Sequence, residues 1–385
     1  MSDAQVPAST TLYFGPWYRK SPYFEATLRY GCSAYDVYNH TYLPSYYDDP
    51  VVEYWHLLEH VTVWDVGVER QVEITGPDAA AFTSLLTPRD LSSCAVGQCK
   101  YVVITAEDGG IVNDPVLLRL ATNHFWLSAA DSDLLLWAKG VAVNAGMDVS
   151  IVEPDVWPLQ VQGPRSKEVM ETLFGDAVAG LRYYFCAEAE VDGIPVVVSR
   201  TGWTGEVGYE IYLRDSGHGD ELWERVMAAG RPHQIRPIAP CEARRIEAGI
   251  FNYGSDMTLE NNPYEISGME RLVDLEKGPF IGREALTRIA TEGVGRKLVG
   301  VRLAGPALAV ELAEPWPVMR DGVLIGRVTD AIHSPRLDQN IGYAWVPADV
   351  AKPGTSIEVH GPNGRIDATV AELPFLDPKK QIPAA

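Results

Sequence analysis

A local pattern that occurs twice constrains the fold more than any other feature of this sequence. It consists of a strand-like segment, a Gly-Pro turn and an apolar-periodic segment typical of a helix. The first copy is RQVEITGPDAAAFTSLL at 70–86, with Asp78 as the expected N-cap of its helix, and the second is PLQVQGPRSKEVMETLF at 158–174. The repeat predicts two similar α+β units, over about 60–150 and 155–250, as a weak internal duplication.

The rest of the chain falls into segments of different character. Residues 1–50 are rich in Tyr and Pro without steady periodicity, which indicates an extended arm packed on the body. Between the two copies, KYVVITAEDGGIVNDPVLLRLATNHFWLSAA predicts three short strands with a hairpin turn at Asp-Gly-Gly, and a helix follows at about 131–146. Short strands after 296 predict a small antiparallel barrel or sandwich. The expected domains are therefore an arm over 1–50, interleaved α+β domains over 51–150 and 155–285, and a barrel over 296–385.

Composition excludes several classes of protein. The formal net charge of −20 argues against binding to nucleic acid or to an anionic membrane, and no apolar run is long enough for a membrane span. The N-terminus lacks the pattern of a signal peptide, so we expect a cytoplasmic protein. The five cysteines form no C-x-x-C pair, and the eight histidines show no metal-ligand spacing, so we expect neither a disulfide framework nor a metal site. The G-x-S-x-G and strand-linked G-x-G-x-x-G motifs are also missing, which disfavours hydrolases and dehydrogenases.

Two segments place chemically useful residues in glycine-rich surroundings. SRTGWTGEVGYEIY at 199–212 is either a β-hairpin with glycine turns or a platform for a flat ligand. EDGGIVNDP at 107–115 puts Asn113 and Asp114 after a Gly-Gly turn. The carboxylate of Asp114 either caps that turn or faces a cleft and holds a cationic or protonated nitrogen.

A third segment concentrates positive charge in this acidic chain. CEARRIEAGIFNYGSDM at 241–257 carries Arg244 and Arg245 next to each other on a helical stretch. Adjacent arginines can hold an anionic ligand, and they can equally form ion pairs on the helix surface. The sequence leaves both alternatives open.

Taken in order along the chain, these segments resemble the folate-binding aminomethyltransferases typified by the T-protein of the glycine cleavage system. The resemblance covers roughly residues 51–345. It rests on these segments: WDVGVERQVEITGPDAAAFTSLLTPRDL, GQCKYVVITAEDGGIVNDPVLL, PLQVQGPRSKEVM, SRTGWTGEVGYEIYL, RRIEAGIFNYGSDM, NPYE, KGPFIGREAL and DGVLIGRVTDAIHSP.

The resemblance implies a fold and a ligand. The fold is α+β, with three domains arranged as a cloverleaf around a central channel and a small C-terminal β-barrel. Tetrahydrofolate is the expected cofactor, with its pterin end innermost. The implied cofactor-binding residues are Tyr101, Asn113, Trp203, Glu210 and Arg244, and the implied catalytic carboxylate is Asp114.

Departures from the T-protein pattern point to a different reaction. The first Asp of the family's Asp-Asp pair is Asn113 here, the Asn of its SNA segment is Ala129, and the Arg of its ARD segment is Cys241. The chain is most similar to the branch of the family that demethylates dimethylsulfoniopropionate. The resemblance therefore implies an enzyme that transfers a methyl group from this sulfonium to tetrahydrofolate. The alternatives are another methylated amine, sulfonium or methoxyl donor, an aminomethyltransferase of the glycine cleavage type, and a folate-binding protein without catalytic activity.

The arm is the segment expected to shape the methyl-donor end. A sulfonium cation is attracted to aromatic rings, so Trp17, Tyr35 and Trp203 are the candidate substrate-binding residues. Tyr18, Tyr23, Phe24 and Tyr38 are further aromatic residues of the arm, and packing against the body is the alternative role for each. Arg19 or Lys20 is a candidate partner for a substrate carboxylate. The expected partners are the small methyl donor and tetrahydrofolate, and the sequence leaves room for a homodimer.

Overall fold

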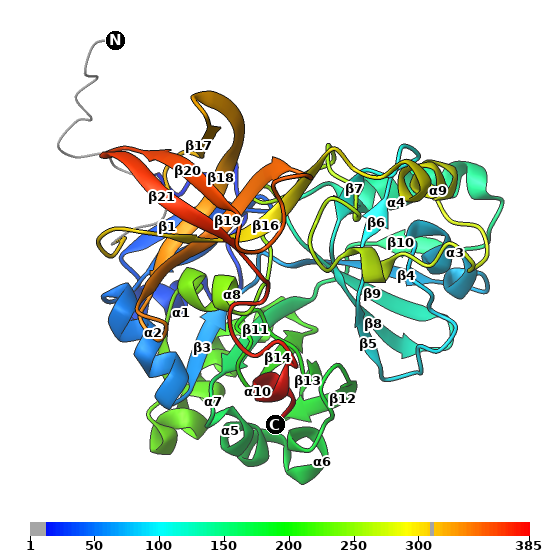
Figure 1. Cartoon of the computed structure of the whole chain (residues 1–385). Helices are drawn as coiled ribbons and strands as arrows, with labels where there is room; N and C mark the ends of the chain where they lie inside the picture. Colours follow the sequence, from blue (N-terminus) through cyan, green and yellow to red (C-terminus); the bar gives the residue numbers. More distant parts are fainter. Residues whose placement is uncertain (1–12, 309–311) are drawn as a thin grey trace.

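The computed structural model describes residues 13–308 and 312–385, which form two sheets flanked by helices, a closed barrel and an N-terminal hairpin (Figure 1). The first sheet carries the first Gly-Pro copy and packs on α3 (Ala79–Leu86) and α4 (Leu134–Ala145). Its strand order is β10 (Ser150–Val152), β4 (Arg70–Thr75), β9 (His124–Ala129), β8 (Val116–Ala121) and β5 (Cys99–Tyr101). A separate small hairpin joins β6 (Ile104–Thr105) to β7 (Ile111–Asn113). The segment expected to form three strands therefore forms five, because two of the expected strands are interrupted, one at residues 102–103 and the other at residues 114–115.

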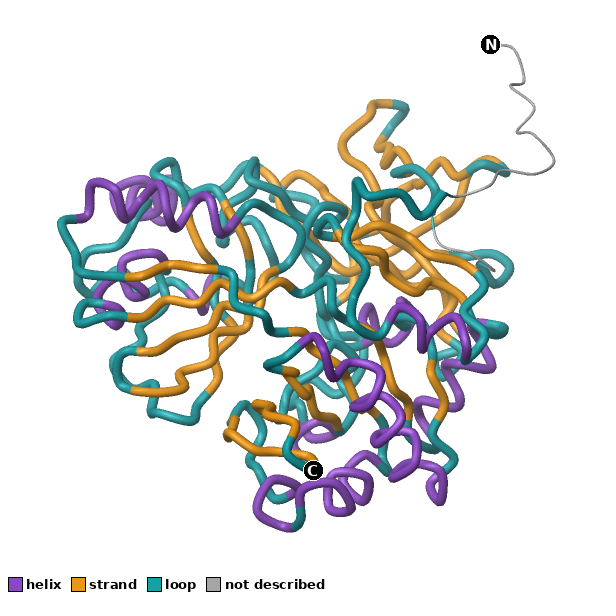
Figure 2. The backbone as a smooth tube through the Cα atoms, turned by 180° about the vertical axis from the view of Figure 1, so that it is seen from behind, coloured by secondary structure: helices purple, strands orange, loops and turns teal. Residues whose placement is uncertain are grey.

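The second sheet carries the second copy. Its strand order is β12 (Cys186–Val191), β13 (Ile194–Ser199), β14 (Gly208–Leu213), β11 (Trp157–Gln162), β3 (Thr62–Asp65) and β15 (Arg236–Pro237). Helices α5 (Ser166–Phe174), α6 (Asp176–Ala179) and α7 (Gly219–Gly230) belong to the same part of the chain. Strand β3, which precedes the first Gly-Pro copy in the sequence, pairs with β11 of the second sheet. The chain therefore crosses from the second sheet to the first after β3. Figure 2 shows the strands from behind, in orange.

Glycine at the two Gly-Pro turns is required by close backbone approach. Gly76 and Gly163 have φ of +120° and +118°. A Cβ atom at either position would lie 2.6 Å from a backbone oxygen, that of Asp148 or of His60. Asp78 lies at the N-cap of α3 as expected, but its carboxylate accepts from the backbone N–H of Asp148 at 2.8 Å and makes no capping bond.

The two sheets are joined at their edges. The backbone N–H of Cys99 donates to the carbonyl of Tyr184 at 2.8 Å, and that of Cys186 donates to the carbonyl of Gly97 at 2.8 Å. Strand β14 is buried along its whole length because both of its faces are covered. Tyr209, Ile211 and Leu213 pack in the core with α5 and α7, and the period of two turns Glu210 and Tyr212 to the opposite face.

The C-terminal part forms the closed barrel. Its strands, in order round the barrel, are β16 (Arg296–Leu303), β19 (Gln339–Pro347), β18 (Val323–Ser334), β17 (Trp316–Arg320), β20 (Ser356–Gly361) and β21 (Gly364–Ala371). The chain then leaves the barrel and returns to the second sheet, where α10 (Gln381–Ala384) ends near the C-terminus (Figure 1). Backbone N–H of Leu376 donates to the carbonyl of Glu247 at 2.9 Å, and the Arg200 side chain donates to the carbonyl of Ala385.

The remaining helices link these bodies. They are α2 (Pro50–Glu59), α8 (Glu242–Glu247) and α9 (Arg283–Glu292), with short 3₁₀ turns at Ser216–His218, Arg231–His233 and Glu270–Leu272. Asp49 caps α2 by accepting from the N–H groups of Val51 and Val52, and Pro50 starts the helix.

The N-terminal arm is more folded than expected. It contains α1 (Phe24–Arg29) and a hairpin of β1 (Ala34–Tyr38) and β2 (Thr41–Tyr46), while residues 1–12 lie outside the described part. Tyr23 is buried, and its hydroxyl donates to the carbonyl of Trp157 at 2.9 Å. The arm is therefore anchored on the second sheet by an aromatic core contact.

Candidate active site

A cavity of about 530 Å³ lies where both sheets, the barrel, the arm hairpin and the C-terminal segment meet. Its charged lining residues are mostly acidic. They are Asp36, Glu69, Asp114, Glu210, Glu242 and Asp330 against Arg271 and Lys380. The cavity is therefore suited to a ligand that carries positive charge or hydrogen-bond donors deep inside, with the two cations available to an anionic group.

Glu210 of β14 is the most heavily hydrogen-bonded carboxylate of the cavity. Its Oε1 accepts from Gln160 Nε2 at 2.7 Å. Its Oε2 accepts from Tyr212 Oη at 2.9 Å and from the hydroxyls of Ser199 and Thr201. Burial raises the pKa of Glu210, and these donors act against that rise by stabilising the charged form.

Asp114, directly after β7, has a free acceptor in the cavity wall. Tyr101 Oη donates to its Oδ2 at 2.8 Å, and Oδ1 is buried without a hydrogen-bond partner among the described residues. Burial raises the pKa of Asp114 to about 7, although the Tyr101 bond acts in the opposite direction. A carboxyl with that pKa can gain or lose a proton near neutral pH, which a general acid or base requires.

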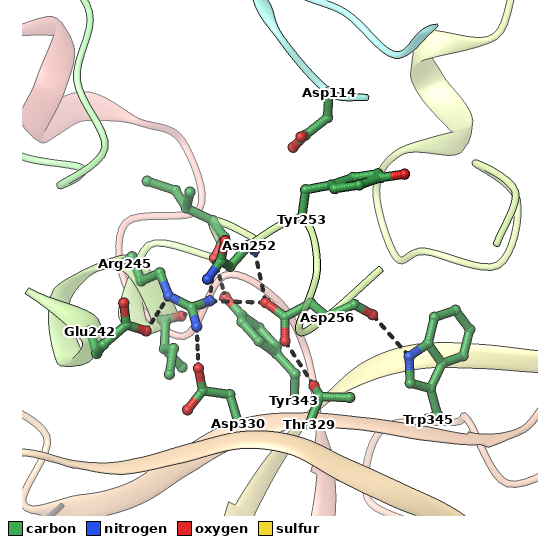
Figure 3. A network of polar contacts seen from close by, with 12 residues as sticks. Asp114, Glu242, Arg245, Asn252, Tyr253, Asp256, Thr329, Asp330, Tyr343 and Trp345 are labelled. Carbon is green, nitrogen blue, oxygen red and sulfur yellow. Dashed lines mark hydrogen bonds and ion pairs between the residues drawn. The ribbon is translucent and has the colours of Figure 1, made fainter. Parts of the chain in front are cut away.

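Trp203, in another part of the cavity wall, lies against Arg245, and Figure 3 shows the buried ion network around that arginine. The guanidinium carbon of Arg245 lies 5.3 Å from the centroid of the Trp203 ring. Arg245 Nη1 is 3.0 Å from Asp256 Oδ2, and the same guanidinium also bonds to Glu242 and Asp330. One positive charge thus faces three carboxylates, and Glu242 and Asp330 also line the cavity. The wall beside Trp203 is therefore negative overall, which favours a cation.

Figure 3 shows Asp114 beyond Tyr253 and Asn252, with its carboxylate turned toward this network. The Tyr253 hydroxyl donates to the carbonyl of Ile111 at 2.9 Å, so its ring is fixed to the strand that carries Asp114. The free oxygen of Asp114 and the face of Trp203 thus belong to the same cavity.

Two of the expected cofactor-binding residues do not reach the cavity. Asn113 is fully buried, its Nδ2 donates to the Ala130 carbonyl and to Ser132 Oγ, and its Oδ1 accepts from Ala130 N–H. It therefore fixes a loop. Arg244 is also fully buried, with Nε 2.7 Å from Glu206 Oε1 and Nη2 2.9 Å from the Gly205 carbonyl. On α8, adjacent residues point about 100° apart, and it is the neighbouring Arg245 whose guanidinium lies over the Trp203 ring.

The two expected substrate-binding residues of the arm also lie elsewhere. Trp17 is 87% exposed and lies outside the cavity. The ring of Tyr35 packs on Phe14 and Phe24, and its hydroxyl is 2.5 Å from Thr27 Oγ1, so its role is arm packing. From the arm, Tyr38 lines the cavity, and its hydroxyl donates to the Tyr253 carbonyl at 3.3 Å.

The proposed partners for a substrate carboxylate are occupied by other side chains. Arg19 pairs with Glu153 and stacks on Trp157, and Lys20 is 3.5 Å from Glu25. Arg271 and Lys380, which no sequence motif singled out, line the cavity instead.

Sequence reasoning also missed Glu69 and the pair Tyr183 and Tyr184, which line the same cavity. Glu69 carried no clear signal, because it is one of four charged residues in the segment VWDVGVERQVEI. The tyrosines carried no signal either, since only the edge contact between the two sheets brings them there.

Within residues 13–308 and 312–385, no group of three or more His, Cys, Asp or Glu side chains is arranged to hold a metal ion. Among the helices of the described part, none has the length and apolar character of a membrane span.

The matching families and relatives agree with this architecture. Residues 23–277 match the GCVT N-terminal domain, and residues 296–377 match the glycine cleavage T-protein C-terminal barrel domain. The chain belongs to the glycine cleavage T-protein family, and the α+β fold with a C-terminal barrel expected from the sequence is confirmed.

Individual relatives cover nearly the whole chain. Dimethylsulfoniopropionate demethylase DmdA from Ruegeria pomeroyi is 40% identical over 354 residues, which are 92% of this chain and 96% of the relative. An aminomethyltransferase from Desulfitobacterium hafniense is 31% identical over 89% of this chain and 93% of the relative. The crystal structure of glycine cleavage system aminomethyltransferase T from Bartonella henselae superposes with a TM-score of 0.83 at 24% identity, over 93% of this chain and 98% of that one.

Proposed function

We propose that this protein is an enzyme of one-carbon transfer that moves a methyl group from dimethylsulfoniopropionate to tetrahydrofolate. The observation that carries the proposal is the 40% identity to the demethylase from R. pomeroyi over 92% of the chain. The cavity supports it, because its lining is rich in carboxylates and aromatic rings. A cationic methyl donor is favoured in such surroundings over a neutral methoxyl compound.

The residues of the cavity fit tetrahydrofolate. The unpartnered Oδ1 of Asp114 is a buried acceptor that a ligand donor would satisfy. Glu210 would accept from the donor groups of the pterin, and Tyr101 and Trp203 would lie along its path. Arg271 and Lys380 are the cations available to the carboxylates of the folate tail.

When bound, tetrahydrofolate supplies N5 as the nucleophile for the methyl group. The sulfonium would leave as a neutral thioether that keeps the C–S electron pair, and one N5 proton would have to be taken up. Asp114 is the proposed acceptor of that proton, because its pKa of about 7 and its free Oδ1 suit the task. Trp203 and the negative wall behind it hold the sulfonium by roughly 0.5–2 kcal/mol of cation–π attraction, and the buried rings exclude water from the reacting atoms.

The test is product formation by the purified protein with tetrahydrofolate and dimethylsulfoniopropionate. We expect methyl-tetrahydrofolate and the demethylated thioether in equal amounts, each dependent on both substrates. A panel of methylated amines and methoxyl compounds, and a lipoyl-bound aminomethyl donor, tests the alternatives. Turnover of the lipoyl-bound donor alone would support an aminomethyltransferase, and folate binding without turnover of any donor would support a non-catalytic protein.

Asp114→Asn separates catalysis from binding in the same assay. We expect it to bind tetrahydrofolate and to lose most turnover, and unchanged turnover would remove Asp114 from the mechanism. The cytoplasmic location and the homodimer stay predictions, and sedimentation of the purified protein tests the second.

A further inference from the structure

Glu69 is a cavity carboxylate with one fixed hydrogen bond. It lies directly before β4, and Ser128 Oγ on β9 donates to its Oε2 at 2.9 Å. Gln71 Nε2 donates to the same Ser128 oxygen at 2.9 Å and to the Glu69 carbonyl at 2.7 Å. The Ser128 oxygen already accepts a hydrogen bond from the Gln71 amide. Its own single proton is therefore the one that is donated to Glu69. Oε2 of Glu69 is thereby fixed as an acceptor, and a proton on this side chain belongs on Oε1.

Glu210 lines the same cavity and has a different supply of donors. Gln160, Tyr212, Ser199 and Thr201 all offer hydrogen bonds to its two oxygens. Hydrogen bonds from neutral donors stabilise an ionised carboxylate. Ser199 and Thr201 also share a hydrogen bond, so at least three of the four donors serve Glu210 at once and favour its charged form. Glu69 accepts a hydrogen bond from Ser128 alone among these side chains, so its charged form is stabilised much less.

The charged neighbours of Glu69 also favour its neutral form. Burial raises the pKa of Glu69 well above its ordinary value, and the charges of Glu210 and then of Asp114 add to the rise, with the Ser128 bond opposing it. The adjacent cation, Arg70, is paired with Glu153, where Nη2 lies 2.5 Å from Oε2. The phenols of Tyr38 and Tyr212, the other titratable groups near Glu69, are neutral in this range because burial raises their pKa.

A neutral carboxyl beside an ionised one presents a donor next to an acceptor. A pterin ring has the complementary pattern, because its C4 carbonyl accepts and the adjacent N3–H and 2-amino groups donate. We propose that Glu69, in its neutral form, donates a hydrogen bond to the pterin C4 carbonyl, while ionised Glu210 accepts from N3–H and the amino group. This inference rests on the proposed function, and it makes Glu69 a cofactor-binding and specificity-determining residue.

The experiment is binding of tetrahydrofolate to the full chain without a methyl donor, by anaerobic titration calorimetry. Glu69→Gln keeps a neutral donor of the same size, so we expect its Kd within about 3-fold of wild type. Glu69→Leu removes the hydrogen bond and is expected to weaken binding about 10-fold or more, since one such bond is worth roughly 1.4 kcal/mol. Glu210→Gln is the control for the ionised partner and is expected to weaken binding at least as much.

A second probe is the 4-amino analogue of tetrahydrofolate, in which the C4 acceptor becomes a donor and N3–H becomes an acceptor. Wild type is expected to bind tetrahydrofolate at least about 10-fold more tightly than its 4-amino analogue, and Glu69→Leu is expected to lose part of that preference, the rest being due to Glu210. This comparison needs only wild type, so it tests the assignment even where Glu69→Leu does not fold.

The possible failures are distinct. A 10-fold loss in Glu69→Gln would mean that Glu69 binds in its ionised form, and it would overturn the inference. Wild-type affinity in folded Glu69→Leu, or equal wild-type affinity for the 4-oxo and 4-amino ligands, would overturn it as well. Failure of wild type to bind tetrahydrofolate would overturn the proposed function and this inference together.

Discussion

Replacing Asp114 by Asn is expected to stabilise the ligand-free protein by an amount that grows with pH. In the unfolded chain this carboxyl has a pKa of 3.8, and in the folded protein burial raises it to about 7. Between these values the unfolded state releases the proton and the folded state keeps it. The free energy of unfolding of wild type therefore falls as the pH rises through this window, and it levels off above it. Asn has no charge to bury, and its amide oxygen can still accept from Tyr101.

The magnitude follows from the two pKa values. Between pH 5 and pH 8, they correspond to a loss of roughly 2.6 kcal/mol in wild type. Because the side chain is partly exposed, screening by solvent reduces this, and we expect the stability difference between Asp114→Asn and wild type to grow by roughly 1.5–2.6 kcal/mol.

The assay is urea unfolding followed by tryptophan fluorescence at pH 5, 6, 7 and 8 and constant ionic strength. The difference in unfolding free energy between variant and wild type is free of the contributions of the other buried acids, because both proteins share them. Asp36→Asn is the matched control, because Asp36 lines the same cavity but is exposed, and its difference from wild type is expected to stay flat. A flat difference for Asp114→Asn, or one that shrinks with pH, would refute the reasoning.

Two further substitutions test the cavity wall at Trp203 and the ion network around Arg245. Trp203→Leu removes a cation–π contact and is expected to raise the KM for the sulfonium by roughly 2- to 30-fold, with Trp203→Phe less affected; equal KM values in steady-state kinetics would exclude the contact. Arg245→Met leaves three carboxylates without their cation and is expected to lower the free energy of unfolding by roughly 3–5 kcal/mol, measured by urea denaturation. Arg245→Lys keeps the charge and should lose less, and wild-type stability of Arg245→Met would contradict the role of the network.

The sequence predicted the parts of the fold that local patterns determine. Both Gly-Pro turns lie where expected because their glycines adopt positive φ against a neighbouring backbone. The pairing of β3 with the second sheet was not readable from its residues, because a strand's partner is set by packing over long sequence distances.

The site was predictable to a similar degree. Tyr101, Asp114, Trp203 and Glu210 line one cavity, and their roles stay predictions until they are tested. Arg244 was expected to bind the cofactor, and the structure places it in a buried pair with Glu206. That partner lies 38 residues away, so no local pattern reveals it. The aromatic residues of the arm resemble one another in sequence, and only the fold separates Tyr38 at the cavity from Tyr35 in the arm core.

The cavity is lined by several separate parts of the fold, and this has a thermodynamic consequence. A ligand bound there stabilises only the arrangement in which the sheets, the barrel and the returning segment that carries Lys380 are all in place. At a concentration of about 100 times its Kd, such a ligand adds roughly 2.7 kcal/mol to the unfolding free energy of that assembled state. A destabilising change on the remote side of the barrel would then appear as weaker folate binding. Folate bound in the cell would in turn offset part of the stability lost through substitutions far from the active site.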